Sequence, residues 1–198
     1  MKKPLWIWII SLALVALWGL TRPALAGAPT DYVRGILDQV MGLQNNPSLS
    51  APSRSQPIHK IIERNFDFSL MAKDSLGSTY ERLNSGQRQE FIRTFSYLFQ
   101  DSYTRLVINF LKKENIQYGR ELPEGDKARV DTAIVRTNEN IPVTYLMHTA
   151  PQGWILYDVT VDGVSILQNY KAKFAETIRT NSFDFLLKRM QEQRQAIQ

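Results

Sequence analysis

The chain has 198 residues, of which 43% are apolar, with a formal net charge of +5 and no cysteine. The absence of cysteine excludes disulfides, thiol catalysis, thiolate metal sites and the lipid-modified cysteine of a lipoprotein. His59 and His148 are the only histidines. Because they do not form a pair at ligand spacing, the sequence offers very few candidate ligands for zinc or a transition metal.

The first 26 residues differ from the rest and are typical of a secretory signal peptide. Lys2 and Lys3 precede an apolar run over residues 5–20, and the small residues Ala24 and Ala26 suit a signal peptidase. The run is shorter than the about 20 residues that span a bilayer, so an uncleaved anchor is the weaker interpretation. We therefore expect cleavage after Ala26 and export of the chain.

Removal of this segment changes the size and charge of the protein. The mature chain, residues 27–198, would have 172 residues, which favours one domain with a core and room for a cavity. The loss of Lys2, Lys3 and Arg22 lowers the formal charge from +5 to +2. The sequence therefore predicts no nucleic-acid partner.

The N-terminal half of the mature chain is predicted to be helical. Thr30 is a plausible N-cap for a helix whose apolar residues recur at intervals of three and four. Residues 44–57, rich in Asn, Ser and Pro, are predicted to form a surface loop. Short helices are expected at 58–62 and 68–76, the second ended by Gly77.

The strongest helical signal follows Ser85, a candidate N-cap, and extends to Lys113. It carries a wide apolar stripe that is rich in aromatic residues. Such a helix must lie against something large. The stripe alone favours a core helix over the wall of a cavity.

Beyond Asn115 the apolar period changes from 3.6 to 2 residues. Strands are expected at 116–120, 128–137, 141–149 and 154–161, with short turns between them. Short turns imply an antiparallel meander, and the alternation leaves one face apolar. Two helices follow, after Ser165 and Ser182. The predicted fold is α+β: a twisted antiparallel sheet of four to five strands with helices packed on one face.

Asp158 is the nearest candidate for a catalytic group. It lies within a predicted strand, near Tyr145, Tyr157 and His148. In an apolar cavity such a carboxylate could have a raised pKa and act as a base. A structural aspartate, hydrogen-bonded at the sheet edge, is the favoured interpretation.

The order of several short motifs resembles the toluene-tolerance, or MlaC-like, family of periplasmic phospholipid-binding proteins. The resemblance runs from Val33 to about Leu187, with Tyr80 standing where many relatives have Trp. The motifs are Phe66-Asp67-Phe68-Ser69-Leu70-Met71-Ala72 with Leu76-Gly77, Gln87-Arg88-Gln89-Glu90-Phe91, Trp154-Ile155-Leu156-Tyr157-Asp158-Val159 with Gly163-Val164-Ser165, and Tyr170 with Phe174.

The resemblance implies a monomeric carrier in the periplasm rather than an enzyme. Its cargo would be a phospholipid, held in an apolar cavity of a cone-shaped NTF2-like or cystatin-like fold, with no further cofactor. The partners it implies are an outer-membrane lipoprotein and porin complex and an inner-membrane ABC transporter with a ring-forming periplasmic subunit. Such a carrier maintains outer-membrane lipid asymmetry. A hopanoid-associated branch also exists, so another lipid could be the cargo.

For such a carrier, the apolar faces of the long helix and of the sheet are predicted to line the cavity. The expected lipid-binding residues are Phe91, Phe95, Leu98, Phe99, Tyr103, Leu106 and Phe110 on the helix and Val130, Ile134, Val143, Tyr145, Met147, Trp154, Leu156, Val159 and Val161 on the strands. Two other classes stay open. One is an enzyme that acts on an apolar substrate with Asp158 and Tyr145, and the other is a structural adaptor with a solid core.

Overall fold

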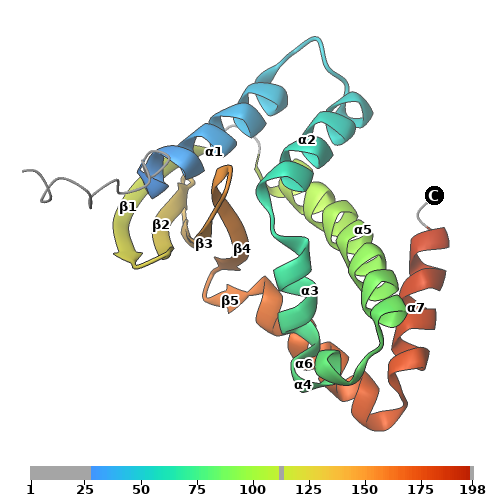
Figure 1. Cartoon of the computed structure of the whole chain (residues 1–198). Helices are drawn as coiled ribbons and strands as arrows, with labels where there is room; N and C mark the ends of the chain where they lie inside the picture. Colours follow the sequence, from blue (N-terminus) through green and yellow to red (C-terminus); the bar gives the residue numbers. More distant parts are fainter. Residues whose placement is uncertain (1–27, 112–113, 197–198) are drawn as a thin grey trace, which may run out of the picture.

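The computed structural model describes residues 28–111 and 114–196 (Figure 1). The predicted signal peptide and its cleavage site lie outside the described residues. The helices are α1 (Pro29–Asn45), α2 (Ala51–Asn65), α3 (Phe68–Leu76), α4 (Ser78–Arg82), α5 (Ser85–Phe110), α6 (Ile166–Thr180) and α7 (Phe183–Gln195). The strands are β1 (Asn115–Glu124), β2 (Lys127–Val135), β3 (Asn140–Ala150), β4 (Gly153–Val161) and β5 (Val164–Ser165).

The predicted α+β class and the antiparallel meander are confirmed. The five strands follow the chain order β1-β2-β3-β4-β5 across one sheet, and each pairs antiparallel with its neighbour. Val130 pairs with Tyr145 and Thr132 with Val143, and all four side chains are buried. The sheet thus has one apolar face, as the alternation of the sequence predicts.

The alternation changes phase within β4. Leu156 pairs with Met147 and Val159 with Tyr145, so the buried positions on β4 are three residues apart at this point. A bulge with one extra residue produces such a shift. The residues predicted to face inward on this strand, Trp154, Leu156, Val159 and Val161, follow the same change of phase and lie on one face of the sheet.

The predicted loop over residues 44–57 is wrong at both ends, because α1 extends to Asn45 and α2 already begins at Ala51. The Ser50 side chain accepts a hydrogen bond from the Ser53 N–H, and Pro52 lies in the first turn, where the missing N–H costs nothing. Pro57 lies inside the helix. The burial of Ile58, Ile61 and Ile62 compensates for the hydrogen bond that Pro57 cannot make.

Two predicted N-caps are also displaced. The cap of α5 is Asn84 rather than Ser85, and Asn84 and Gln87 form a reciprocal capping box. α1 begins at Pro29, so Thr30 lies inside the helix rather than at its cap. The Thr30 N–H donates to Glu121 Oε2 on β1 at 2.9 Å, and this carboxylate takes the place of a cap.

Three further boundaries agree with the sequence, whereas α4, over Ser78–Arg82, was not predicted. Gly77 ends α3 with a positive φ of 54°, and Ser165 and Ser182 cap α6 and α7 by accepting hydrogen bonds from Gln168 N and Phe185 N. α5 ends at Phe110, before the predicted Lys113, which is outside the described residues.

The helices lie on one side of the sheet (Figure 1). α1 contacts β1 and β2, while α3 and α6 contact β4. α5 packs chiefly against α2, α3 and α7 rather than directly on a strand. The long helix and the apolar face of the sheet are therefore separated by side chains and by the space described below.

Candidate functional site

An apolar pocket of about 190 Å³ lies between the C-terminal half of α5, the strands β2 to β4 and the start of α6. We call it the sheet pocket. Its wall consists almost entirely of aliphatic and aromatic side chains, namely Tyr103, Leu106, Val107, Phe110, Leu111, Ile134, Val143, Tyr145, Val161, Val164 and Ile166.

Two further pockets adjoin it. The helix pocket, of about 430 Å³, lies among α5, α6 and α7 and is lined by Phe99, Ser102, Tyr103, Leu106, Ile166, Asn169, Tyr170, Lys173, Phe174 and Gln193. The inner pocket, of about 40 Å³, lies behind α1 and α2 and is lined by Ile36, Leu37, Val40, Ile61, Ile62, Phe66, Tyr103, Val107, Leu111, Tyr145 and Leu156. Tyr103 belongs to all three walls, so the pockets meet at this side chain.

The sheet pocket reaches the protein surface between α5 and β5. Leu106 and Val164 both line it, yet 42% of Leu106 and 60% of Val164 is exposed. Asp162 and Gly163, with φ of 49° and 77°, form the tight turn that places Val164 beside the pocket. These two exposed apolar side chains form the edge of the sheet pocket at the protein surface.

Nine of the predicted lining residues do line one of these pockets: Phe99, Tyr103, Leu106, Phe110, Ile134, Val143, Tyr145, Leu156 and Val161. The structure places the other seven in the core, away from the three pockets: Phe91, Phe95, Leu98, Val130, Met147, Trp154 and Val159. The two groups separate along α5. Its N-terminal half is packed solid, and its C-terminal half faces open space.

Aromatic contacts explain this division. The Phe91 ring meets those of Phe174 and Phe183 at 5.8 and 5.9 Å, and the Phe95 ring meets that of Tyr170 at 5.5 Å. α6 and α7 thus supply large side chains that fill the space beside the first half of α5. The same helix therefore contributes both core and pocket wall.

The sequence-based list missed the residues that α1, α2 and α6 contribute to the pockets. Ile36, Leu37 and Val40 follow the apolar face of α1, and Ile61 and Ile62 that of α2. Their periodicity was the available signal. It indicates a buried face but does not distinguish a filled interface from a hollow one.

Tyr103 is held rigidly where the pockets meet. Its ring stacks on Phe99, with centroids 5.5 Å apart, and meets Phe66 edge-on at 5.4 Å. Burial raises the pKa of the Tyr103 hydroxyl above its usual range, and the negative charge of Asp158 raises it further. Burial also raises the pKa of Tyr145. Both phenols are therefore neutral hydrogen-bond donors within an apolar wall.

Asp158 has a structural arrangement. It is 4% exposed, and its Oδ1 accepts hydrogen bonds from the backbone N–H groups of Val159 at 2.8 Å and Leu167 at 3.0 Å. Its Oδ2 accepts one from the Ser165 hydroxyl. The carboxylate thus joins β4 to the first turn of α6, and its oxygens are already occupied.

A second carboxylate joins β3 to α3. Asp67 caps α3 by accepting from the Leu70 N–H at 2.9 Å, and its other oxygen lies 3.0 Å from His148 Nε2. The Asp67 N–H donates to the Leu156 carbonyl at 2.8 Å. These bonds fix the neighbouring Phe66, whose ring lines the inner pocket.

Comparison with known proteins identifies the family. The sequence model described as "MlaC protein" matches residues 34–192. The chain belongs to the MlaC family. The resemblance seen in the ordered motifs is thereby confirmed.

One curated relative is similar to this chain in sequence, and one solved structure is similar to it in fold. The chain is 25% identical over 122 residues to the intermembrane phospholipid transport system binding protein MlaC of Haemophilus influenzae. That match covers 59% of this chain and 57% of the relative's length. The phospholipid-binding protein of Ralstonia solanacearum, solved in complex with a phospholipid, has a TM-score of 0.73 at 19% identity. It covers 86% of this chain and 98% of the solved one, so the two share a fold.

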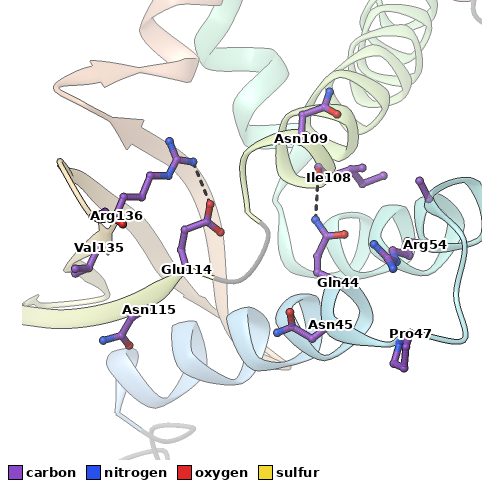
Figure 2. A pocket seen from close by; sticks show the side chains of 12 residues that line it. Gln44, Asn45, Pro47, Arg54, Ile108, Asn109, Glu114, Asn115, Val135 and Arg136 are labelled. Atoms are coloured by element: carbon purple, nitrogen blue, oxygen red, sulfur yellow. Dashed lines mark hydrogen bonds and ion pairs between the residues drawn. The ribbon is translucent and has the colours of Figure 1, made fainter.

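This MlaC family member also has a polar pocket of about 1050 Å³, at the C-terminal end of α5 (Figure 2). Arg136 pairs with Glu114 at 3.3 Å and donates to the Phe110 carbonyl at 2.8 Å. From the opposite side, Gln44 donates to the Ile108 carbonyl at 3.1 Å. These side chains satisfy the free carbonyl groups at the helix end.

Two kinds of feature are absent from residues 28–111 and 114–196. No group of three or more His, Asp or Glu side chains there is arranged to hold a metal ion. None of the helices described is both long and apolar enough to cross a bilayer.

Proposed function

We propose that this protein binds a glycerophospholipid, with its acyl chains in the sheet pocket and the pockets that adjoin it. The observation that carries the proposal is the apolar sheet pocket, whose entrance is edged by the exposed side chains of Leu106 and Val164. Membership of the MlaC family and the phospholipid in the Ralstonia structure support the same class of cargo.

The pockets must widen to accept a lipid. Ligand pockets generally enclose about 300–1,000 Å³, and the sheet pocket has about 190 Å³. Because α5 packs chiefly on other helices, a small outward movement of the sheet from α5 would enlarge the sheet pocket and join it to its neighbours. Such a movement would leave the aromatic core around Phe91 and Phe95 intact.

The energetics of lipid transfer favour a carrier. Each buried CH₂ is worth about 0.8 kcal/mol, so a chain of about sixteen carbons gains roughly 12 kcal/mol on leaving water. A lipid held this strongly does not leave unaided. Release therefore requires a partner that favours the open state of the carrier.

The partners are proposed by analogy with the MlaC family. We propose that the protein is exported after cleavage at Ala26, acts in the periplasm as a monomer without enzymatic activity, and exchanges lipid with an outer-membrane lipoprotein and porin complex and with an inner-membrane ABC transporter. This exchange would maintain outer-membrane lipid asymmetry. Both oxygens of the Asp158 carboxylate already accept hydrogen bonds within the protein, and this supports a binding role over acid–base chemistry.

Mass spectrometry of the exported protein, purified without detergent, tests the proposal. We expect a chain that begins at Gly27 and carries about one phospholipid. A bound hopanoid would show that the cargo is a different lipid, while the proposed role as a lipid carrier would stand. An empty protein that takes up no lipid from vesicles would overturn the proposal.

A matched pair of variants on β3 locates the site. Val143 lines the sheet pocket, whereas Leu146 lies on the opposite face of the strand. Val143→Phe would occupy the volume of about two CH₂ groups of lipid, so we expect bound lipid to fall roughly tenfold. Leu146→Phe should leave it unchanged. Equal lipid content in both variants would place the lipid elsewhere.

A further inference from the structure

The three apolar pockets are arranged as a fork. Besides Tyr103, the sheet pocket shares Leu106 and Ile166 with the helix pocket. It shares Val107, Leu111 and Tyr145 with the inner pocket. The helix and inner pockets share no wall residue except Tyr103. A molecule that enters past Leu106 and Val164 therefore meets two separate branches, with Tyr103 between them.

Tyr103 is suited to separate two chains. Its stacked contact with Phe99 and its edge contact with Phe66 prevent the ring from turning aside. A fixed ring between two apolar branches directs each acyl chain into one branch. Because the branches exist before binding, the site itself needs less ordering when the lipid binds, and the entropic cost of binding is smaller.

The Tyr103 hydroxyl is available to a ligand. Tyr103 belongs to the walls of all three pockets, so a lipid that fills them passes beside this side chain. A hydroxyl in an apolar wall is more stable when a ligand supplies an acceptor. In a two-chain lipid the carbonyl oxygens next to the glycerol lie where the chains diverge, so they would be the acceptors nearest to the fork.

We propose that Tyr103 is the specificity-determining residue of the lipid site, with its ring between the two acyl chains and its hydroxyl donating to an ester carbonyl. This inference rests on the proposed function. The cargo it selects is a diacyl ester lipid, with one chain in the helix pocket and the other directed to the inner pocket.

The first test concerns the ester. Delipidated protein is mixed with equal amounts of a diacyl phosphatidylglycerol and its dialkyl ether analogue, and the bound lipids are weighed by native mass spectrometry. One net hydrogen bond predicts a roughly fivefold preference for the ester. Tyr103→Phe should lose this preference while it still binds lipid. Tyr97→Phe, a control on the same helix outside the three pockets, should keep it.

The second test concerns the fork. Asn169 is exposed and lines the helix pocket, so Asn169→Trp should fill that branch without disturbing the core. We expect the variant to exchange its two-chain lipid for single-chain lysophosphatidylglycerol. Gln168→Trp, at an exposed neighbour outside the three pockets, should keep the two-chain lipid. Ser102→Phe, from the facing helix, provides a second block of the same branch.

The outcomes separate this inference from the function on which it rests. If the unchanged protein binds neither phosphatidylglycerol, the carrier proposal itself fails. If it binds both equally, or if Tyr103→Phe retains the ester preference, the hydroxyl has no role in selection. Full two-chain occupancy in Asn169→Trp and in Ser102→Phe would overturn the fork.

Discussion

The side-chain amide of Gln44 on α1 donates to the Ile108 carbonyl on α5 at 3.1 Å (Figure 2). The carbonyls of Val107 and Leu111 also lie within hydrogen-bonding distance of this nitrogen, so its two N–H groups are shared among three acceptors. Gln44 is 7% exposed, so a helix end that would otherwise be buried without partners is satisfied from a neighbouring helix. This single side chain fixes α1 against the part of α5 that lines the sheet pocket.

We predict that Gln44→Met lowers the free energy of unfolding by about 1–2 kcal/mol, because it removes the donor and leaves buried carbonyl oxygens unpaired. Urea denaturation measures the change. Gln39→Met is the control, since Gln39 is exposed on the same helix and donates to the Gly35 carbonyl one turn before it. Equal midpoints for the two variants would contradict the capping role.

Replacement of Asp158 by Asn should destabilise the protein less than replacement by Ala. Asp158→Asn can keep Oδ1 as the acceptor for Val159 and Leu167, so we expect a loss of about 1 kcal/mol and unchanged lipid content. Asp158→Ala leaves both backbone N–H groups unpaired and should cost about 3 kcal/mol. Thermal denaturation and lipid mass spectrometry measure the two effects. A folded Asp158→Asn protein that had lost a measurable turnover would instead indicate a general base.

Much of the fold was accessible from the sequence because each element carries its own signal. Gly77 ends α3, and Ser165 caps α6, through local chemistry that the chain itself displays. The start of α2 was not accessible, because Asn, Ser and Pro at its N-terminus are equally typical of a loop. Its helical state depends on burial of Ile58 against elements distant in sequence.

The position of the pocket could be predicted only in part. Leu98 and Tyr103 both lie on the apolar stripe of α5, and periodicity treats them alike. The difference between them comes from α6 and α7, whose rings fill the space beside the first half of α5. A sequence pattern reports which face is buried, whereas the packing partner decides whether any volume is left.

Trp154 should report on this distinction. It is the only Trp among the described residues, is 5% exposed, and lines none of the three apolar pockets. We therefore expect its fluorescence emission maximum to stay the same when bound lipid is removed. A shift on delipidation of a loaded sample would extend the lipid site to this end of β4, as the sequence pattern favoured.

The buried tyrosines predict the alkaline limit of stability. Burial raises the pKa of Tyr32 to about 12, and burial with the charge of Asp158 raises that of Tyr103. In the unfolded chain these hydroxyls ionise at about pH 10, so above that pH the folded state holds more protons than the unfolded state. Stability should be constant with respect to these groups below about pH 10 and fall above it.

Chemical denaturation at stepped pH measures this fall. Tyr32→Phe and Tyr103→Phe should each flatten it, because a phenylalanine has no proton to lose in either state. An unchanged slope in both variants would assign the alkaline loss to other groups.

The chain-order meander of the sheet has a consequence for the sequence of folding events. Each strand pairs with its immediate neighbour, so the sheet requires only short loops, whereas Thr30 of α1 must find Glu121 across 91 residues. We expect refolding followed by hydrogen exchange to protect the β2 and β3 amides before those of α1. The inner pocket behind α1 would then be the last pocket to be enclosed. A folding chain would therefore be able to bind lipid before α1 docks.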